Sequence, residues 1–276
     1  MNEAFVSGIF PRSDDLIKAI NLFERNRITK EDLEEKIKDE KNFWLEKQNG
    51  LTYISDPAVT WNDIFRPFVM NAKNMEIGPL TRYLETNTFF KKPIIRNYPE
   101  FFDVIKNEYP DKPILENVDK ILLPGPYTFL SVAEIENNLD RKKILDTISD
   151  FIFSLARKYR YAEFKEFIVK DINTLKSLGD LYSTYSGKGY VFTNIKTKDF
   201  IDFPIDYTVK SENFKNLPDN VIIEFIDVFK TKLEDFSKIP DNIKITTNES
   251  LEFLPYSIAI KTTDLMINYP GGKHVL

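Results

Sequence analysis

Charged side chains lie where several predicted strands end. Lys165 and Glu166 occur in one predicted strand, Asp227 lies near the end of another, and Glu249 follows a third. Because the carboxyl ends of parallel strands meet at one edge of a sheet, carboxylates at these positions can act together as acids, bases or acceptors for an amine. We take Glu166, Asp227 and Glu249 as candidate catalytic residues, with Lys165 beside them.

A second group of candidates surrounds residues 50–69, where a predicted strand is followed by a run of polar and aromatic residues. Arg12 and Arg66 can bind a carboxylate through two parallel hydrogen bonds. Asp56 and Asp63 can accept hydrogen bonds from N–H groups. The candidate ligand-binding residues are Gly8, Arg12, Asp56, Asn62, Asp63, Arg66, Gly125, Thr128 and Asn194.

Each of these residues also has a structural interpretation. Charges at strand ends pair with one another or cap the following helix, because a buried charge needs a partner whatever the function. Arg66 would then close a salt bridge with Asp56 or Asp63, and Gly125, between two prolines, would be a backbone requirement of its turn. Trp61 and Phe65 are interpreted as packing residues.

The composition excludes several classes of site. The chain of 276 residues has no cysteine, which removes disulfides, thiolate metal ligands and a cysteine nucleophile. Its one histidine, His274, lies near the end of the chain, where a general base would be poorly held. The net charge of −5 argues against a nucleic-acid groove, which needs a basic patch.

The distribution of apolar residues predicts a folded protein away from membranes. Apolar residues make up 42% of the chain, enough for a sizeable core. No stretch reaches the roughly 18 apolar residues of a membrane span. The N-terminal sequence MNEAFVSGIFPR lacks the basic and apolar regions of a signal peptide. We therefore expect a cytoplasmic location.

Strands and helices alternate along the chain, and these elements must position the candidate residues. The apolar pattern predicts eight strands, at residues 6–10, 51–55, 121–129, 164–169, 189–195, 204–209, 221–228 and 243–247. It predicts helices at residues 14–25, 30–48, 142–159, 171–185 and 256–268, and one through Phe236 after the seventh strand. Runs such as VIIEFIDV are apolar on both faces, which is typical of parallel strands.

This alternation predicts an α/β fold, a single-domain (β/α)8 TIM barrel spanning residues 1–276. Residues 70–120 form a long excursion between the second and third strands, which we expect over the C-terminal face of the barrel. A doubly wound open sheet is the alternative, although no glycine-rich phosphate loop supports it.

Several motifs, in order along the chain, resemble the barrels of cobalamin-independent methionine synthase. They are GIFPR at residues 8–12, ITKEDL at 28–33, GLTYISDPAVTWNDIFRPF at 50–68, LPGPYTFL at 123–130, IIEFIDVFKTKLED at 222–235 and ITTNESLEFLPYSIAIKTTDLM at 245–266. The resemblance implies a TIM barrel and a role in methionine biosynthesis. It also implies a methylated folate-type pterin as the methyl donor and homocysteine as the acceptor.

The resemblance implies a zinc site as well, built from His, Cys, Glu and Cys, whose metal converts the homocysteine thiol to thiolate. This sequence departs from that pattern. The family's H-x-C falls in residues 189–194, which contain neither ligand, and Glu249 stands at the later cysteine. The family's H-G-E and D-E-P motifs fall near Asp56 and Lys165, where the residues also differ. A site of Asp and Glu alone would suit magnesium or calcium better than zinc. We predict no metal.

Three functional hypotheses follow. In the first, the chain is a zinc-free barrel that works with a separate zinc-bearing core barrel and binds a methyl-pterin or shapes the partner's site. In the second, it is a stand-alone methyltransferase or pterin-binding enzyme with a carboxylate-lined site. In the third, it is a non-catalytic binding or regulatory barrel. The first is the hypothesis we favour.

Overall fold

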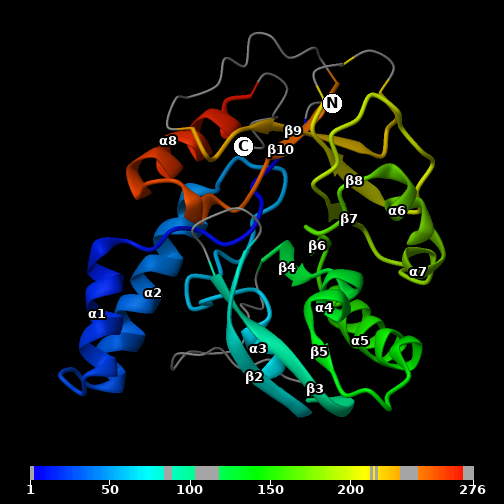
Figure 1. Ribbon diagram of the computed structural model, residues 1–276. Coiled ribbons are helices and arrows are strands. Elements are labelled where there is room, and N and C mark those ends of the chain that lie inside the picture. Colours follow the sequence, from blue (N-terminus) through cyan, green and yellow to red (C-terminus); the bar gives the residue numbers. More distant parts are fainter. Residues whose placement is uncertain are drawn as a thin grey trace.

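The computed structural model describes residues 3–83, 89–102, 118–211, 214, 217–230 and 242–269. Figure 1 shows a central sheet with helices around it and a long β-hairpin, β2 and β3, that extends away from it. His274 and most of the helix predicted through Phe236 lie outside the described residues.

The central sheet contains seven parallel strands in the order β1-β10-β9-β8-β7-β6-β4. The strands are β1 (Glu3–Phe5), β4 (Lys120–Pro124), β6 (Tyr161–Lys165), β7 (Gly189–Phe192), β8 (Asp206–Val209), β9 (Val221–Ile226) and β10 (Lys244–Thr247). β4, β6 and β7 are buried along their whole length. Since all neighbours are parallel, the carboxyl ends of the strands lie at one end of the sheet, as predicted.

The sheet curls but does not close into an eight-stranded barrel. The rings of Phe5 in β1 and Tyr161 in β6 stack with their centroids 5.5 Å apart, although other strands lie between β1 and β6 in the sheet order. The predicted TIM barrel is therefore correct only as an α/β fold with a curled parallel sheet.

The second predicted strand, at residues 51–55, is the element that was predicted wrongly. It is reduced to one parallel bridge between Ser55 and Lys120. The side-chain amide of Gln48 accepts a hydrogen bond from the Ser55 backbone N–H at 2.8 Å and donates to its carbonyl at 3.0 Å. A side chain thus satisfies backbone groups that a neighbouring strand would otherwise pair.

Three strand boundaries also differ from the prediction. β1 precedes residues 6–10, since Gly8 has a φ of +75° that does not fit a strand. The strand predicted at 121–129 ends at Pro124, and helix α4 (Pro126–Val132) follows because proline is well suited to the first turn of a helix. β6 begins three residues before the predicted 164–169 and ends at Lys165. The remaining four strands are confirmed with somewhat shorter bounds.

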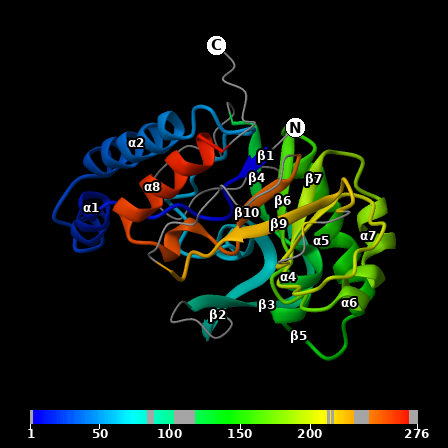
Figure 2. The ribbon, with the colours of Figure 1, turned by 90° about the horizontal axis from the view of Figure 1, so that it is seen from above.

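Helices cover the outer face of the sheet in two groups (Figure 2). One group is α1 (Asp14–Glu24), α2 (Lys30–Lys47) and α8 (Tyr256–Ile267), and the other is α5 (Arg141–Ala156), α6 (Ile172–Ser177) and α7 (Gly179–Ser183). Four of the predicted helices are confirmed, whereas residues 171–185 form two short helices and the helix predicted through Phe236 lies mostly outside the described residues. Two shorter elements are α3 (Arg66–Val69) and the 3-10 helix η2 (Leu251–Phe253). Within the described ranges, no helix is long and apolar enough to cross a membrane.

The excursion at residues 70–120 contains a second sheet. β2 (Ala72–Arg82) pairs antiparallel with β3 (Phe89–Phe101), and β5 (Glu134–Ile135) adds to β3 in parallel. The Tyr83 hydroxyl, at the end of β2, donates to Glu249 at 3.0 Å, just after β10. The excursion therefore reaches the carboxyl ends of the central strands, as predicted, although residues 84–88 and 103–117 lie outside the described part.

Candidate functional site

A buried cluster of ion pairs lies inside the curled sheet. Glu163, in the middle of β6, is fully buried. Its carboxylate accepts hydrogen bonds from the Ser7 hydroxyl at 2.5 Å, the Gly8 backbone N–H at 3.1 Å and Lys120 Nζ at 2.7 Å. Lys120 Nζ also donates to the carbonyl of Val6. Glu163 thus joins the chain after β1 to β4 across the interior of the sheet.

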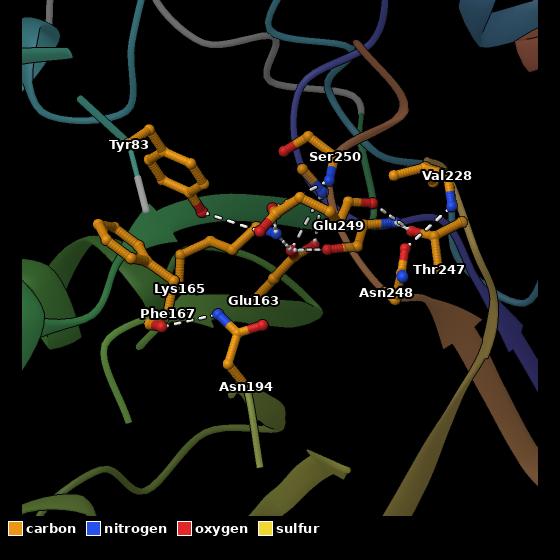
Figure 3. Close-up of polar contacts among 12 residues, drawn as sticks. Tyr83, Glu163, Lys165, Phe167, Asn194, Val228, Thr247, Asn248, Glu249 and Ser250 are labelled. Carbon is orange, nitrogen blue, oxygen red and sulfur yellow. Dashed lines mark hydrogen bonds and ion pairs between the residues drawn. The ribbon is translucent and has the colours of Figure 1, made fainter. Parts of the chain in front are cut away.

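The other half of the cluster lies two residues further along β6. Lys165 Nζ is 2.7 Å from Glu249 Oε1, 3.9 Å from Glu163 Oε1 and 3.4 Å from the centroid of the Phe192 ring. The second oxygen of Glu249 accepts the hydrogen bond of Tyr83. Figure 3 shows Tyr83 and Lys165 approaching Glu249, with Glu163 beneath them. The result is one continuous chain of hydrogen bonds and ion pairs.

The charges of the cluster balance, with two lysines against two glutamates. Burial lowers the pKa of Lys120 from its ordinary value, although Glu163 opposes this effect. Burial alone would raise the pKa of Glu163, but Lys120 and Lys165 outweigh it and the pKa lies below its ordinary value. Burial and the nearby Glu249 raise the pKa of Tyr83 well above its usual range, so its hydroxyl remains a hydrogen-bond donor.

A pocket lies beside Lys165 at the carboxyl ends of the strands. Its lining combines apolar and polar residues. The apolar residues are Tyr83, Phe89, Phe90, Phe167 and Phe253 with Ile9, Ile64 and Leu122, and the polar residues are Asn62, Asp63, Lys165, Ser250 and Glu252. This composition is typical of small-molecule sites. Its free volume is only about 30 Å³, which is room for water and not for an amino acid or a pterin. A larger ligand therefore requires the aromatic side chains to move.

Three of the residues singled out from the sequence meet in the buried cluster. Lys165 and Glu249 form the buried ion pair, and Gly8 donates to Glu163 through its backbone. Gly8 must be glycine because of its positive φ, and because a Cβ there would lie 1.9 Å from the Ser250 hydroxyl oxygen. The first-strand turn is thus packed tightly against the chain that follows β10.

The loop at residues 56–66 is held by its own side chains. Arg12 donates to the carbonyls of Val59 and Trp61 at 2.6 and 2.7 Å, and to the side chain of Asn62 at 3.0 Å. Asp63 accepts from the backbone of Arg66 at the start of α3 and from the Arg66 guanidinium at 3.3 Å. The structural interpretation of the Asp63–Arg66 pair is confirmed. Asn62 and Asp63 also line the pocket.

Glu166 is fully buried and faces α4. Its carboxylate accepts from the backbone N–H groups of Tyr127 and Thr128, at 3.0 and 2.6 Å, and from the Tyr182 hydroxyl at 2.9 Å. Burial raises its pKa to about 7 in spite of these bonds. Gly125 is needed here, since a Cβ would lie 2.1 Å from the carboxyl carbon of Glu166. These contacts fix the beginning of α4 and leave Glu166 away from the pocket lining.

The remaining predicted residues lie apart from the pocket lining. Asp227 accepts from Asn248 at 2.9 Å and pairs with Lys230 at 2.9 Å; burial would raise its pKa, but these partners lower it below its ordinary value. Asn194 donates to the Phe167 carbonyl at 2.7 Å. Asp56 accepts from the Ala58 backbone at 2.8 Å.

The candidate residues predicted from the sequence did not include several members of the cluster, namely Ser7, Tyr83, Lys120 and Glu163. The signal was present in β6, where Tyr161, Glu163 and Lys165 alternate with small or apolar residues. Successive side chains of a strand point to opposite faces, so this alternation places all three on the inner face. Because the predicted strand began at residue 164, Glu163 fell outside it.

A further buried acid, Glu224, lies in β9. One carboxylate oxygen accepts from the Thr208 hydroxyl at 2.7 Å, and the other lies 3.7 Å from Lys210 Nζ. That second oxygen has no hydrogen-bond partner among the described residues. Burial raises the pKa of Glu224 to about 8, so the side chain carries its proton at neutral pH.

The donor set does not fit the zinc site that the resemblance implies. β7 and the residues after it provide no His or Cys, and Glu249, at the position of the later cysteine, is bound by the Lys165 ammonium group. In the described part of the chain, no group of three or more His, Cys, Asp or Glu residues is arranged to hold a metal ion. Zinc prefers thiolate and imidazole ligands, and this cluster offers neither.

Known structures share this fold. A B12-independent methionine synthase from Shewanella sp. W3-18-1, in complex with selenomethionine, matches with a TM-score of 0.61 and 13% sequence identity, over 87% of this chain and 88% of that chain. A protein assigned as a vitamin-B12 independent methionine synthase from Listeria monocytogenes matches with a TM-score of 0.63 and 12% identity, over 98% of both chains. No family model and no curated protein matches the chain. The chain therefore has a methionine-synthase-like fold, which confirms at the level of the fold the resemblance seen in its motifs.

Proposed function

We propose that this chain is a zinc-free, methionine-synthase-like barrel that takes part in methyl transfer to homocysteine together with a separate zinc-bearing barrel. The observation that carries the proposal is the buried ion pair between Lys165 and Glu249, 2.7 Å apart, beside an aromatic-lined pocket. The pocket lies at the carboxyl ends of the strands, where barrel enzymes keep their sites.

Because Lys165 occupies the position next to Glu249, the proposal assigns activation of the homocysteine thiol to the separate zinc-bearing barrel. Its ammonium group already provides the positive charge next to Glu249, in a space that excludes water. A thiol has an ordinary pKa of about 8.5, so homocysteine needs a metal or a base to become thiolate at neutral pH. The proposal therefore gives this chain the binding of a ligand and the shaping of a shared site.

The lining of the pocket supports two ligands. A methylated pterin has a flat ring that can pack against Phe167 or Tyr83, and polar edges that can meet Asn62 and Lys165. Methionine is the second candidate, because the similar Shewanella protein was solved with selenomethionine. Either ligand needs more room than the present 30 Å³, and rotation of Phe89, which lines the pocket and is 46% exposed, would provide it.

The first test is reconstitution. The tagged chain is purified from its native cells, and the proteins that accompany it are identified by mass spectrometry. We expect a cysteine-bearing methionine-synthase barrel in near-equal amount, and methyl transfer only when both proteins are present. Efficient methionine synthesis by the purified chain alone would overturn the proposal.

A binding test locates the ligand. Methyl-tetrahydropteroylglutamate or methionine should raise the melting temperature by an amount that grows with ligand concentration. The variant Phe89→Ala should reduce this increase, since Phe89 lines the pocket. Leu80→Ala is the matched control, because Leu80 is similarly exposed on the same hairpin but does not line the pocket. No stabilisation by either ligand would count against binding at this pocket.

A stand-alone enzyme is the second candidate, and the contact between Tyr83 and Glu249 favours it. The hydroxyl, the carboxylate and Lys165 form a chain of hydrogen bonds beside the pocket, which can move a proton to or from a bound molecule. If the chain turned over a methylated pterin without a partner, and Glu249→Gln abolished turnover while the circular dichroism spectrum was unchanged, this second candidate would replace the first.

A further inference from the structure

The N-terminal end of the curled sheet, opposite the pocket beside Lys165, holds a larger cavity. Its free volume is about 300 Å³. The first residues of five strands line it, namely Glu3, Tyr161, Gly189, Asp206 and Lys244. Tyr53, Gly187, Lys188, Pro204 and Ile205 complete the lining. In barrel folds this end usually serves stability. A cavity of this volume matches the lower range of small-molecule sites.

A layer of aromatic rings separates this cavity from the buried ion pairs. Tyr53 stacks on Tyr161 with ring centroids 4.3 Å apart, and Tyr161 stacks on Phe5. Tyr161 precedes Glu163 by two residues in β6, and Phe5, the last residue of β1, precedes Ser7 by two residues, so the rings form the next layer toward the N-terminal ends of the strands. The cavity is therefore a separate site and not the far end of the first pocket.

Some charged groups of the cavity have hydrogen-bond partners and others have none among the described residues. Asp206 accepts from Lys244 Nζ at 2.7 Å and from the Tyr161 hydroxyl at 3.1 Å. Lys244 lies directly beside Glu3 in the register of β1 and β10, yet it reaches Asp206 instead. No hydrogen bond or ion pair to the described residues holds the Glu3 carboxylate or the Lys188 ammonium group.

We propose that this cavity binds a small zwitterion of the α-amino acid class, with its ammonium group at Glu3 and its carboxylate at Lys188. The formal charges of the lining cancel, since Glu3 and Asp206 oppose Lys188 and Lys244. A ligand with a single charge leaves either Glu3 or Lys188 unmatched, whereas a zwitterion pairs both. This inference does not depend on the function proposed for the opposite end.

The test is an NMR titration of the full-length, 15N-labelled chain with L-alanine and with L-methionine. We expect saturable shifts of the backbone amides at residues 187–189, 206 and 244. Acetate and methylammonium, which each carry one charge, should give no saturable shift there. Absence of a saturable shift with both amino acids at up to about 10 mM, enough to reveal a Kd of about 1 mM, would overturn the proposal.

Variants assign the shifts to the cavity. Glu3→Gln and Lys188→Met should each weaken binding about tenfold, as expected for the loss of a hydrogen bond to a charged group. Both side chains lack partners in the described structure, so the fold should persist. Lys158→Met, at an exposed lysine outside the lining, is the control and should bind normally. Shifts that survive both cavity variants but disappear in Phe89→Ala would place the amino acid at the other end and refute the inference.

Discussion

Lys165 is the last residue of β6 and Glu249 lies two residues after β10, and their Nζ and Oε1 atoms are 2.7 Å apart. Both side chains are only 3% exposed. Removing one partner of a buried pair leaves the other charged and poorly solvated, which is more damaging than losing the attraction itself.

The variant Lys165→Met should therefore lower the free energy of unfolding by about 3–5 kcal/mol, measured by urea denaturation. Lys165→Met combined with Glu249→Leu should recover much of the loss, because neither charge then remains buried alone. Lys73→Met is the control, since Lys73 and its partner Glu100 are each more than 60% exposed and such pairs contribute little. Equal losses in Lys165→Met and Lys73→Met would contradict this reading of the cluster.

The raised pKa of Glu224 should make the stability of the protein depend on pH. Its pKa is raised by burial to about 8, against an ordinary value of 4.5. Between these two pH values the folded state keeps a proton that the unfolded chain has released, so stability falls as the pH rises from about 4.5 to 8. Glu224→Gln removes this contribution, because glutamine is neutral throughout and its amide oxygen can still accept from Thr208.

The measurement is urea denaturation of both proteins at pH 5, 6, 7 and 8. The wild type should lose more stability than Glu224→Gln across this range, by a few kcal/mol at most, since one pKa unit corresponds to about 1.4 kcal/mol. Glu166, whose pKa is about 7, contributes a slope of the same sign in both proteins. Parallel stability curves would show that Glu224 titrates at its ordinary pKa.

Gly8 and Gly179 form a matched pair of glycines. A Cβ on Gly8 would meet the Ser250 side chain at 1.9 Å, at a φ of +75°, whereas a Cβ on Gly179 meets no atom within 4 Å. Gly8→Ala should therefore lower the melting temperature markedly. Gly179→Ala, in helix α7, should leave it unchanged or raise it slightly, because alanine restricts the unfolded chain. A similar effect of the two substitutions would show that the turn at Gly8 has room to adjust.

The periodicity of the sequence predicted the parallel sheet because buried strands such as β9 are apolar on both faces. It could not predict the loss of the second strand. That loss depends on Gln48, at the end of α2, whose side-chain amide pairs with both backbone groups of Ser55 seven residues later. A side chain that replaces a neighbouring strand in this way leaves no mark on the alternation of apolar and polar residues.

The candidate site was also only partly predictable from the sequence. Lys165 and Glu249 were visible as charges near predicted strand ends, where parallel strands converge. Glu163 and Lys120 were not, since they lie within or at the start of strands, where a charge is unexpected unless its partner is known. Tyr83 lies in the long excursion, and only the three-dimensional arrangement brings it to Glu249.

A conservative substitution of Arg12 distinguishes a structural role of its side chain from direct ligand binding. Its guanidinium group donates through three different nitrogens to the carbonyls of Val59 and Trp61 and to the side chain of Asn62. Lysine has one nitrogen and cannot reproduce this planar arrangement. Arg12→Lys should lower the free energy of unfolding by about 1–3 kcal/mol through the lost hydrogen bonds.

Hydrogen exchange supplies the local measurement for this variant. The amides of residues 58–65 should exchange faster in Arg12→Lys, and a pocket ligand should bind more weakly because Asn62 and Asp63 line the pocket. Arg96→Lys, on the exposed face of the hairpin, is the matched control and should change neither property. Weaker ligand binding with unchanged stability and exchange would mean that Arg12 leaves its loop contacts to bind the ligand itself.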